Sequence, residues 1–208
     1  MTYSVVSAAT EATLIAERII FASGYLLTEV LRRKRASLAI EHRPPLLCEN
    51  AIFMFPQIDV GMGKELLAWP HWVLKCRYTG LGILFGKFWE NAHEVSKHGA
   101  NLPPPPCHFL SVRESVLSKD PLFFQRAEWL LPSLESSRDV GQNVFADLVE
   151  YREIMEECDA FSREPTISSF EHVIGQIVES DFYTRARKLA AIELENQKRG
   201  SHTNHANT

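Results

Sequence analysis

The chain has 208 residues, which is enough for one sizeable hydrophobic core and short for two independent ones. Hydrophobic residues make up 45% of it and charged residues 23%, an ordinary usage for a globular protein that argues against a disordered or membrane protein. The formal net charge of -4 disfavours a general nucleic-acid binder, because such proteins normally carry a basic face.

The cysteines are widely spaced and none forms a Cys-x-x-Cys pair, which excludes a simple zinc ribbon or thioredoxin-like motif; they are Cys48, Cys76, Cys107 and Cys158. Residues 1–10 are polar and lack the pattern of a signal peptide. The apolar stretch 14–31 contains Glu17, Arg18 and Glu29, so we expect an amphipathic helix there rather than a membrane span. We therefore expect a soluble protein of the reducing cytoplasm that has no membrane partner.

A long N-terminal helix is predicted over 10–39, because its apolar residues recur close to every 3.6 residues. The cations Arg32, Arg33, Lys34 and Arg35 lie towards the C-terminal end of this helix, where positive charge interacts favourably with the helix dipole. We prefer that role to a phosphate or nucleic-acid contact, since the run is short and the chain is acidic overall.

A strand buried on both faces is predicted over 51–55, an apolar run followed by Pro56, with a short helix as the alternative that periodicity alone leaves open. A second strand is predicted over 71–78, where apolar and polar side chains alternate. The glycines at 80 and 82 then predict a turn into a strand over 83–89, so the simplest account of this region is a hairpin. One glycine-broken helix over 72–89 is the alternative.

A rigid polyproline run at 103–106 precedes a further predicted strand over 107–116. Asp120 and Pro121 predict the start of a helix that reaches Leu131, with Asp120 as its N-cap. Apolar residues from Val144 to Cys158 step by three and four, which indicates an amphipathic helix.

Ser168 and Glu171 form a capping box that opens the last helical region, and a break is expected near Ser180 and Asp181. Residues 200–208 are small and polar, and we predict a disordered tail there. The expected architecture is a single α+β domain over 1–199. It consists of a small antiparallel sheet at about 51–116, packed by a long N-terminal helix and two to four C-terminal helices.

Metal-ligand character is concentrated in Glu90, His93, Glu94 and His98. Glu90-x-x-His93 has the spacing found in carboxylate-bridged di-iron bundles, but such bundles need a second motif of this kind and two further glutamates. The motif is incomplete, so we interpret the segment as a solvated polar stretch and predict no metal site.

A second polar group comprises His71, Cys76, Cys107 and His108. Neighbouring residues of a strand point to opposite faces, which excludes Cys107 with His108 as a catalytic pair; Cys76 and His108, on neighbouring strands, could form a nucleophilic dyad. A histidine or cysteine in an aromatic-lined pocket also meets the requirement for an axial haem ligand. In the structural alternative, both cysteines are small buried hydrophobes and His108 is a hydrogen-bonded strand residue.

The first functional hypothesis is a small-molecule-modifying enzyme or ligand-binding protein, of which a haem-dependent oxidoreductase is one form. Its pocket would lie between the sheet and the helices and be lined by aromatic residues, namely Trp72, Tyr78, Phe85 and Trp89. His108 is the acid–base candidate, Arg113 the anion anchor and His71 a further polar anchor. Cys76 and Trp72 are the candidates for cofactor binding, although the sequence identifies no cofactor.

The second hypothesis is a non-catalytic interaction or assembly module that uses the polyproline run, the basic end of the first helix or the amphipathic terminal helices. A small-molecule ligand is the partner expected under the first hypothesis, and no nucleic-acid partner is expected under either. The sequence leaves open whether the chain forms a homo-oligomer.

Overall fold

The computed structural model describes residues 2–38, 46–55, 57–95, 99–120, 124 and 127–204. They form an α+β fold in which a three-stranded antiparallel sheet is combined with a long N-terminal helix and several C-terminal helices. Of the helices in this part of the chain, none has both the length and the apolar character that crossing a membrane requires.

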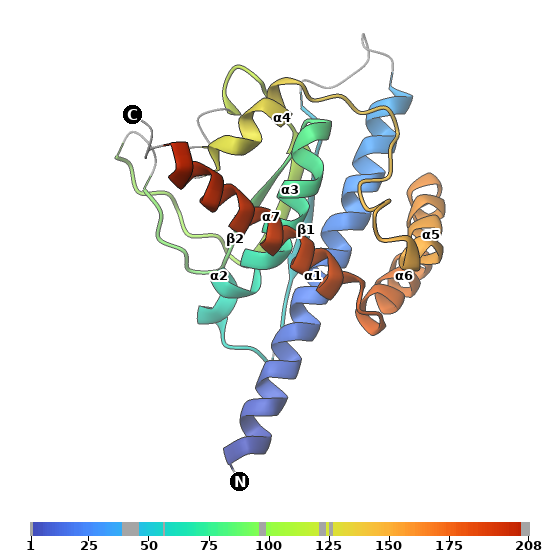
Figure 1. Ribbon diagram of the computed structural model, residues 1–208. Coiled ribbons are helices and arrows are strands. Elements are labelled where there is room, and N and C mark those ends of the chain that lie inside the picture. The colour runs from blue at the N-terminus through green and yellow to red at the C-terminus, as the bar shows by residue number, and fades with distance from the viewer. Residues whose placement is uncertain are drawn as a thin grey trace.

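The long helix α1 (Thr2–Ser37) runs through the middle of the molecule, and its N-terminal end projects beyond the rest (Figure 1). The sheet and α3 (Ala68–Tyr78) contact one side of α1, while α5 (Arg152–Arg163) and α6 (Ile167–Glu179) contact the other. The predicted N-terminal helix is confirmed. Because α1 is covered from both sides, its middle turns supply a large part of the core.

The sheet has the strand order β1-β3-β2, from β1 (Cys48–Phe53), β3 (His108–Glu114) and β2 (Ile83–Phe88). Both pairings are antiparallel; Phe53 lies opposite His108, and Phe88 lies opposite Phe109. Alternate residues of β3, such as Leu110 and Val112, are fully buried, which is the period of two expected for a strand with one face on the core. These three strands match three of the four that the sequence predicts.

The predicted strand over 71–78 is wrong, because these residues belong to helix α3. Val73 and Leu74 follow the buried Pro70 by three and four positions, and Tyr78 follows Leu74 by four, as on one face of a helix. Leu74 and Tyr78 are four residues apart, a separation that fits a period of two as well as a helical turn. The alternation in the sequence was therefore ambiguous at two of the three fully buried positions of 71–78, and Val73 departs from it.

The predicted hairpin is consequently wrong, and the broken-helix alternative holds only as far as a short 3-10 helix, Thr79–Leu81. Gly82 follows with a φ of 68°, a left-handed conformation that glycine adopts without strain, and the chain then enters β2. A short helix, α2 (Gly63–Leu66), precedes α3 in the chain.

The helix predicted over 121–131 is not formed in the described residues of that range, where a 3-10 helix, Glu128–Leu130, leads into α4 (Leu131–Glu135). Residues 121–123, 125 and 126 lie outside the described residues, so most of the predicted helix is not tested. The Asp120 carboxylate accepts hydrogen bonds from Arg113 and from the backbone N–H of Val116. It thereby closes the end of β3 onto the following turn.

The amphipathic helix predicted from Val144 begins later, at Arg152, because the Asn143 side chain accepts the N–H of Phe145 at 2.9 Å and stabilises a turn there. The capping box of α6 is formed by Thr166 and Ser169 instead of Ser168 and Glu171. The break at Ser180 is confirmed. Helix α7 (Phe182–Asn204) extends into the segment predicted as a disordered tail, and 205–208 lie outside the described residues.

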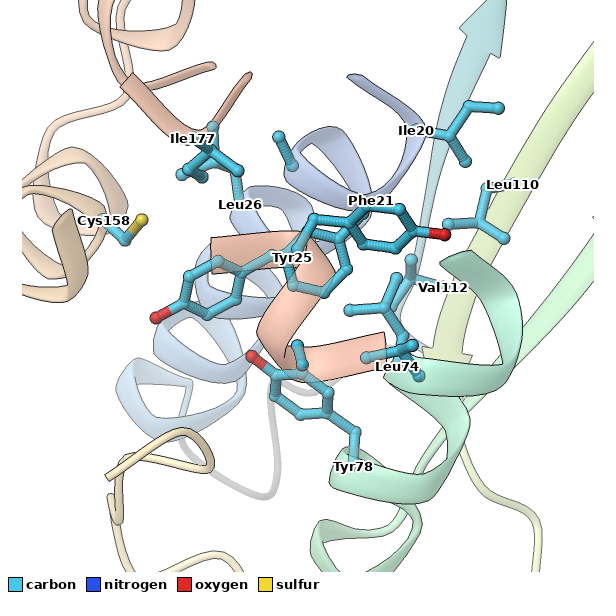
Figure 2. Close-up of a cluster of buried hydrophobic side chains, with 14 of the residues drawn as sticks. Ile20, Phe21, Tyr25, Leu26, Leu74, Tyr78, Leu110, Val112, Cys158 and Ile177 are labelled. Carbon is cyan, nitrogen blue, oxygen red and sulfur yellow. The ribbon is translucent and has the colours of Figure 1, made fainter. Parts of the chain in front are cut away.

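The core surrounds the middle of α1, where aromatic residues meet side chains from α3, β3, α5 and α6 (Figure 2). Phe21 contacts Phe145 and Phe182 edge to face, with ring centroids 5.8 and 5.6 Å apart. Gly24 marks the closest approach of α1 to its neighbours: a Cβ added there would lie 2.5 Å from Leu74 and 2.6 Å from Leu110. A glycine at this position lets α1 contact α3 and the sheet at once.

Candidate functional site

His71 is half-buried on α3, where its Nε2 lies 2.9 Å from the carbonyl oxygen of Phe85 on β2. Burial lowers the pKa of His71 to about 4, so the ring is neutral at physiological pH. A neutral ring donates from Nε2 to that carbonyl. The hydrogen bond joins the helix to an edge strand, which is a structural role.

His108 is buried at the start of β3, and its Nδ1 accepts the backbone N–H of Glu90 at 3.0 Å. The ring lies against Gly63, where an added Cβ would be 2.4 Å from the ring carbon Cε1. Both observations describe a histidine held tightly between two backbone segments. This geometry agrees with the hydrogen-bonded strand histidine that the sequence left open as the alternative.

Arg113 lies five residues after His108 on β3 and therefore projects from the opposite face of the sheet. Its guanidinium donates to the Asp120 carboxylate at 2.7 and 3.0 Å and to the carbonyl of Glu114 at 2.8 Å. The hydrogen bond to Asp120 raises the pKa of Arg113. The expected anion anchor is thus already paired with a carboxylate of its own chain.

Cys76 lies on α3 and not on a strand beside His108, so the expected Cys76–His108 arrangement of neighbouring strands is wrong. Burial raises the pKa of the Cys76 thiol to about 12, which keeps it protonated and a poor nucleophile. Trp72, also on α3, is half-buried and contacts Trp129. The expected aromatic lining contributes to the core instead, since Tyr78 and Phe85 are buried with ring centroids 5.9 Å apart.

Within the described residues, no group of three or more His, Cys, Asp or Glu side chains could hold a metal ion. His98, one of the four residues considered for such a site, lies outside the described residues.

A polar cavity of about 720 Å³ lies beside the C-terminal half of α1. We call it the arginine cavity. The last turns of α1, the end of β3 and the loop after α4 contribute its charged residues, Glu29, Arg32, Arg33, Arg35, Glu114 and Asp139, and the hydroxyls of Ser115 and Ser137. The turn before β2 adds Leu81 and Gly82 to the lining. None of the five residues that the sequence suggested as a site lines it.

Arg32 is the most constrained residue of the arginine cavity, with only 8% of its side chain exposed. All its N–H groups have acceptors. Nε and Nη2 donate to the carboxylate of Asp139 at 2.9 and 2.7 Å, and Nη2 also donates to the carbonyl of Gln142 at 2.8 Å. Nη1 donates to both carboxylate oxygens of Glu29 at 3.0 Å. Burial alone would lower the pKa of Arg32, but the hydrogen bond to Asp139 and the charge of Glu29 raise it.

Asp139 joins the loop after α4 to α1. It accepts hydrogen bonds from Arg32, from Arg35 and, at 3.0 Å, from the backbone N–H of Gly141. Burial would raise the pKa of Asp139, but these donors outweigh it and hold the pKa at about 2. Gly141 has a φ of 80°, which lets the loop turn back tightly enough for its N–H to reach the carboxylate.

Glu29 forms a wall that the arginine cavity shares with a second cavity of about 600 Å³. The Tyr78 hydroxyl donates to Oε1 of Glu29 at 2.6 Å, and burial together with the charge of Glu29 raises the pKa of Tyr78. Arg32 and Gly141 also line both cavities. The two spaces are therefore neighbours on either side of the Glu29–Arg32 ion pair.

Two hydroxyl groups flank Gly82 in the arginine cavity. A Cβ added to Gly82 would lie 3.0 Å from Oγ of Ser137 and 3.2 Å from Oγ of Ser115. Neither hydroxyl makes a hydrogen bond to another residue that the structure describes, so both are free to bind a ligand. No histidine or cysteine is among the described residues that line this cavity.

Sequence reasoning missed this site because its charges come together only in the fold. The basic run was attributed to the helix dipole, yet Glu29, Arg32 and Arg35 recur every three residues and share one face of α1. That spacing was the one local sequence pattern that indicated the site. Asp139 belongs to no such pattern, since it lies in a polar loop 107 residues after its partner Arg32.

Comparisons with protein-family models, with curated proteins and with solved structures find no match to this chain.

Proposed function

We propose that this protein binds a small polar molecule carrying both a cationic and an anionic group, and that the ligand occupies the arginine cavity. The volume of about 720 Å³ is in the range of cavities that hold small molecules. The observation that carries the proposal is the balance of its lining, which has three arginines and three carboxylates beside two free hydroxyls.

The charged residues are fixed by one another before any ligand arrives. Arg32, Arg35 and Asp139 form one hydrogen-bonded group in which every N–H group of Arg32 has an acceptor. A ligand would therefore meet their fixed charges of both signs and would hydrogen-bond to the hydroxyls of Ser115 and Ser137. Such preorganisation reduces the entropy lost on binding. A purely anionic ligand would compete with the carboxylates already held by the arginines, whereas a zwitterion complements both signs.

Thermal unfolding in the presence of matched ligands tests this proposal. A panel would contain amino-acid-like zwitterions, the corresponding amides without a negative charge, and the corresponding deaminated acids. We expect some zwitterions to raise the Tm, because a ligand at 100 times its Kd stabilises the folded state by about 2.7 kcal/mol. Stabilisation by apolar compounds alone, or equal stabilisation by the acids that lack the cationic group, would contradict the proposal.

The haem-dependent form of the small-molecule hypothesis stays a prediction. A Soret band after incubation with haem would support it, and its absence would count against it. That measurement is independent of the arginine cavity.

A further inference from the structure

A separate cavity, of about 370 Å³, lies between the N-terminal half of α1 and the segment that leads from β1 towards α2 (Figure 1). We call it the aliphatic cavity. It shares no lining residue with the arginine cavity. Most of its lining is apolar and includes Ala12, Ile15 and Ile19 of α1 and Met54, Phe55 and Ile58 of the segment after β1.

The α1 wall of the aliphatic cavity is one face of the helix. Ile15 follows Ala12 by three residues and Ile19 follows Ile15 by four, so the three side chains lie on the same side of α1. Ile15 is 41% exposed, and Met54 on the opposite wall is 82% exposed. Large apolar side chains that are exposed together around a hollow are typical of surfaces that bind another molecule.

The opposite wall is held in place by the fold. Phe55 stacks on the buried Phe53 with ring centroids 6.0 Å apart, and its carbonyl accepts the N–H of Ile58 at 2.9 Å. Phe55 and Ile58 also pack against the hydrophobic core. The cavity is therefore formed before a ligand arrives, which reduces the entropy lost on binding. Met54 adds an adaptable side chain at its surface, because a thioether chain fits apolar ligands of different shapes.

The charge of the aliphatic cavity comes from Glu11. Among the described residues that line the cavity, Glu11 alone has a charged side chain, and Gln57 adds a neutral amide. No described residue forms an ion pair with Glu11, and its side chain is exposed. A carboxylate at the solvent border of an apolar cavity attracts a cationic group and repels an anionic one.

We propose that the aliphatic cavity binds a small molecule that combines an apolar chain with one cationic head group, such as a primary alkylamine. The chain would displace water from the aliphatic walls, while the ammonium group would stay hydrated beside Glu11. A diamine of the same length would bring its second charge against apolar walls, which is unfavourable. Because the two cavities share no lining residue, this inference does not depend on the ligand proposed for the arginine cavity.

The methyl resonances of the full chain, labelled with 13C in its four methionines, test this site directly. Met54 would be assigned with the Met54→Leu variant. Hexylamine hydrochloride would be titrated at constant pH and ionic strength, with hexanol, sodium hexanoate and hexanediamine in parallel series. We expect hexylamine to shift the Met54 resonance along a saturating curve, while that of Met155 on α5 stays in place.

The length of the chain and the charge of the head group should contribute separately. From butylamine to octylamine, each added methylene should tighten binding by roughly threefold to fourfold until the cavity is filled. Glu11→Gln should weaken hexylamine binding by up to about fivefold, as for an exposed ion pair, and leave hexanol binding unchanged. Glu153→Gln, at an exposed glutamate on α5, is the matched control and should change neither.

The assignment is overturned if no amine shifts the Met54 resonance, if hexanoate or the diamine binds as tightly as hexylamine, or if affinity does not depend on chain length. Equal preference for hexylamine over hexanol in the wild type and in Glu11→Gln would also overturn the role of Glu11. A Met54 shift that follows protein concentration without any ligand would show that a second copy of the chain covers the cavity instead. The wild-type titrations decide the matter even where a variant fails to fold.

Discussion

Two buried groups on α1 have the same chemistry and different surroundings. At Glu29 the carboxylate accepts the Tyr78 hydroxyl at 2.6 Å and the guanidinium of Arg32 at 3.0 Å. Twelve residues earlier, Glu17 accepts the Tyr183 hydroxyl and the guanidinium of Arg187, each at 2.7 Å. Each group therefore combines one carboxylate, one tyrosine and one arginine.

The groups at Glu17 and Glu29 differ in the segments that cover them. Over Glu17, helix α7 supplies fully buried residues such as Tyr183 and Ala186, and Arg187 lies 4.8 Å from the ring centroid of Trp69. Around Glu29, Asp139 and Gln142 of the loop after α4 hold Arg32 through hydrogen bonds, and two cavities open beside the ion pair. A buried charged group can thus be packed into the core or line a cavity. The segment that lies against it determines which of the two occurs.

The largest effect is expected from Arg32→Ala. This change leaves Glu29 and Asp139 in their buried positions without their main partner. The free energy of unfolding should fall by about 3–5 kcal/mol, as for other buried ion pairs that lose one member. Urea denaturation measures it. Arg33→Ala is the matched control: the Arg33–Asp159 pair is exposed, so its loss should cost at most about 1 kcal/mol.

The contribution of Asp139 can be recognised by how the free energy of unfolding changes as the pH is lowered. The pKa of Asp139 is lowered to about 2 in the folded protein, whereas an unfolded aspartate titrates near about 3.9. Its stabilising contribution is therefore complete above about pH 4 and is lost as the pH falls through about 2.

The expected loss is about 2 kcal/mol, obtained from urea denaturation at a series of pH values. Asp139→Asn should be less stable than the wild type at neutral pH, and the difference should narrow on acidification. A difference that stays constant between pH 5 and 2 would show that Asp139 is not held by Arg32 and Arg35 as described.

The smallest expected effect is the difference in the free energy of unfolding between two tyrosine-to-phenylalanine variants. Tyr183→Phe should lower the free energy of unfolding by about 2 kcal/mol, since a buried carboxylate loses a hydrogen bond that nothing replaces. Tyr78→Phe should cost about 1 kcal/mol, because water from the adjoining cavities can reach Glu29. Denaturant unfolding of both variants measures the difference. Equal losses, or a larger loss for Tyr78→Phe, would mean that the cavities do not hydrate Glu29.

How far the sequence predicts the fold depends on whether the signal is local. The strand around Leu110 and Val112 and the helix that contains Phe21 follow from their periodicity, because burial on one face repeats along the chain. Helix α3 was misassigned because Leu74 and Tyr78 satisfy both periods. The capping box of α6 was displaced by two residues, since Thr166 has the same chemistry as Ser168.

The site was less predictable than the fold. His71, His108 and Arg113 were proposed for their chemistry, yet each already has a partner within the chain, at Phe85, Glu90 and Asp120 respectively. Whether a polar group is satisfied depends on tertiary contacts that no local pattern reports. Trp72, which the sequence suggested as a cofactor contact, has a buried indole N–H for which the described residues supply no acceptor.

The central claim is that the arginine cavity, beside Glu29 and Arg32, is a ligand site, whereas the group around Glu17 has only a structural role. Calorimetric titration of the tightest-binding zwitterion into Ser137→Trp tests it, because the larger side chain would occupy space in the arginine cavity while the residues of its ion pairs stay unchanged. Ser136→Trp, one residue away and exposed, is the control. The account predicts that binding is lost in the first variant and retained in the second. Equal affinity of both variants and the wild-type protein would contradict it.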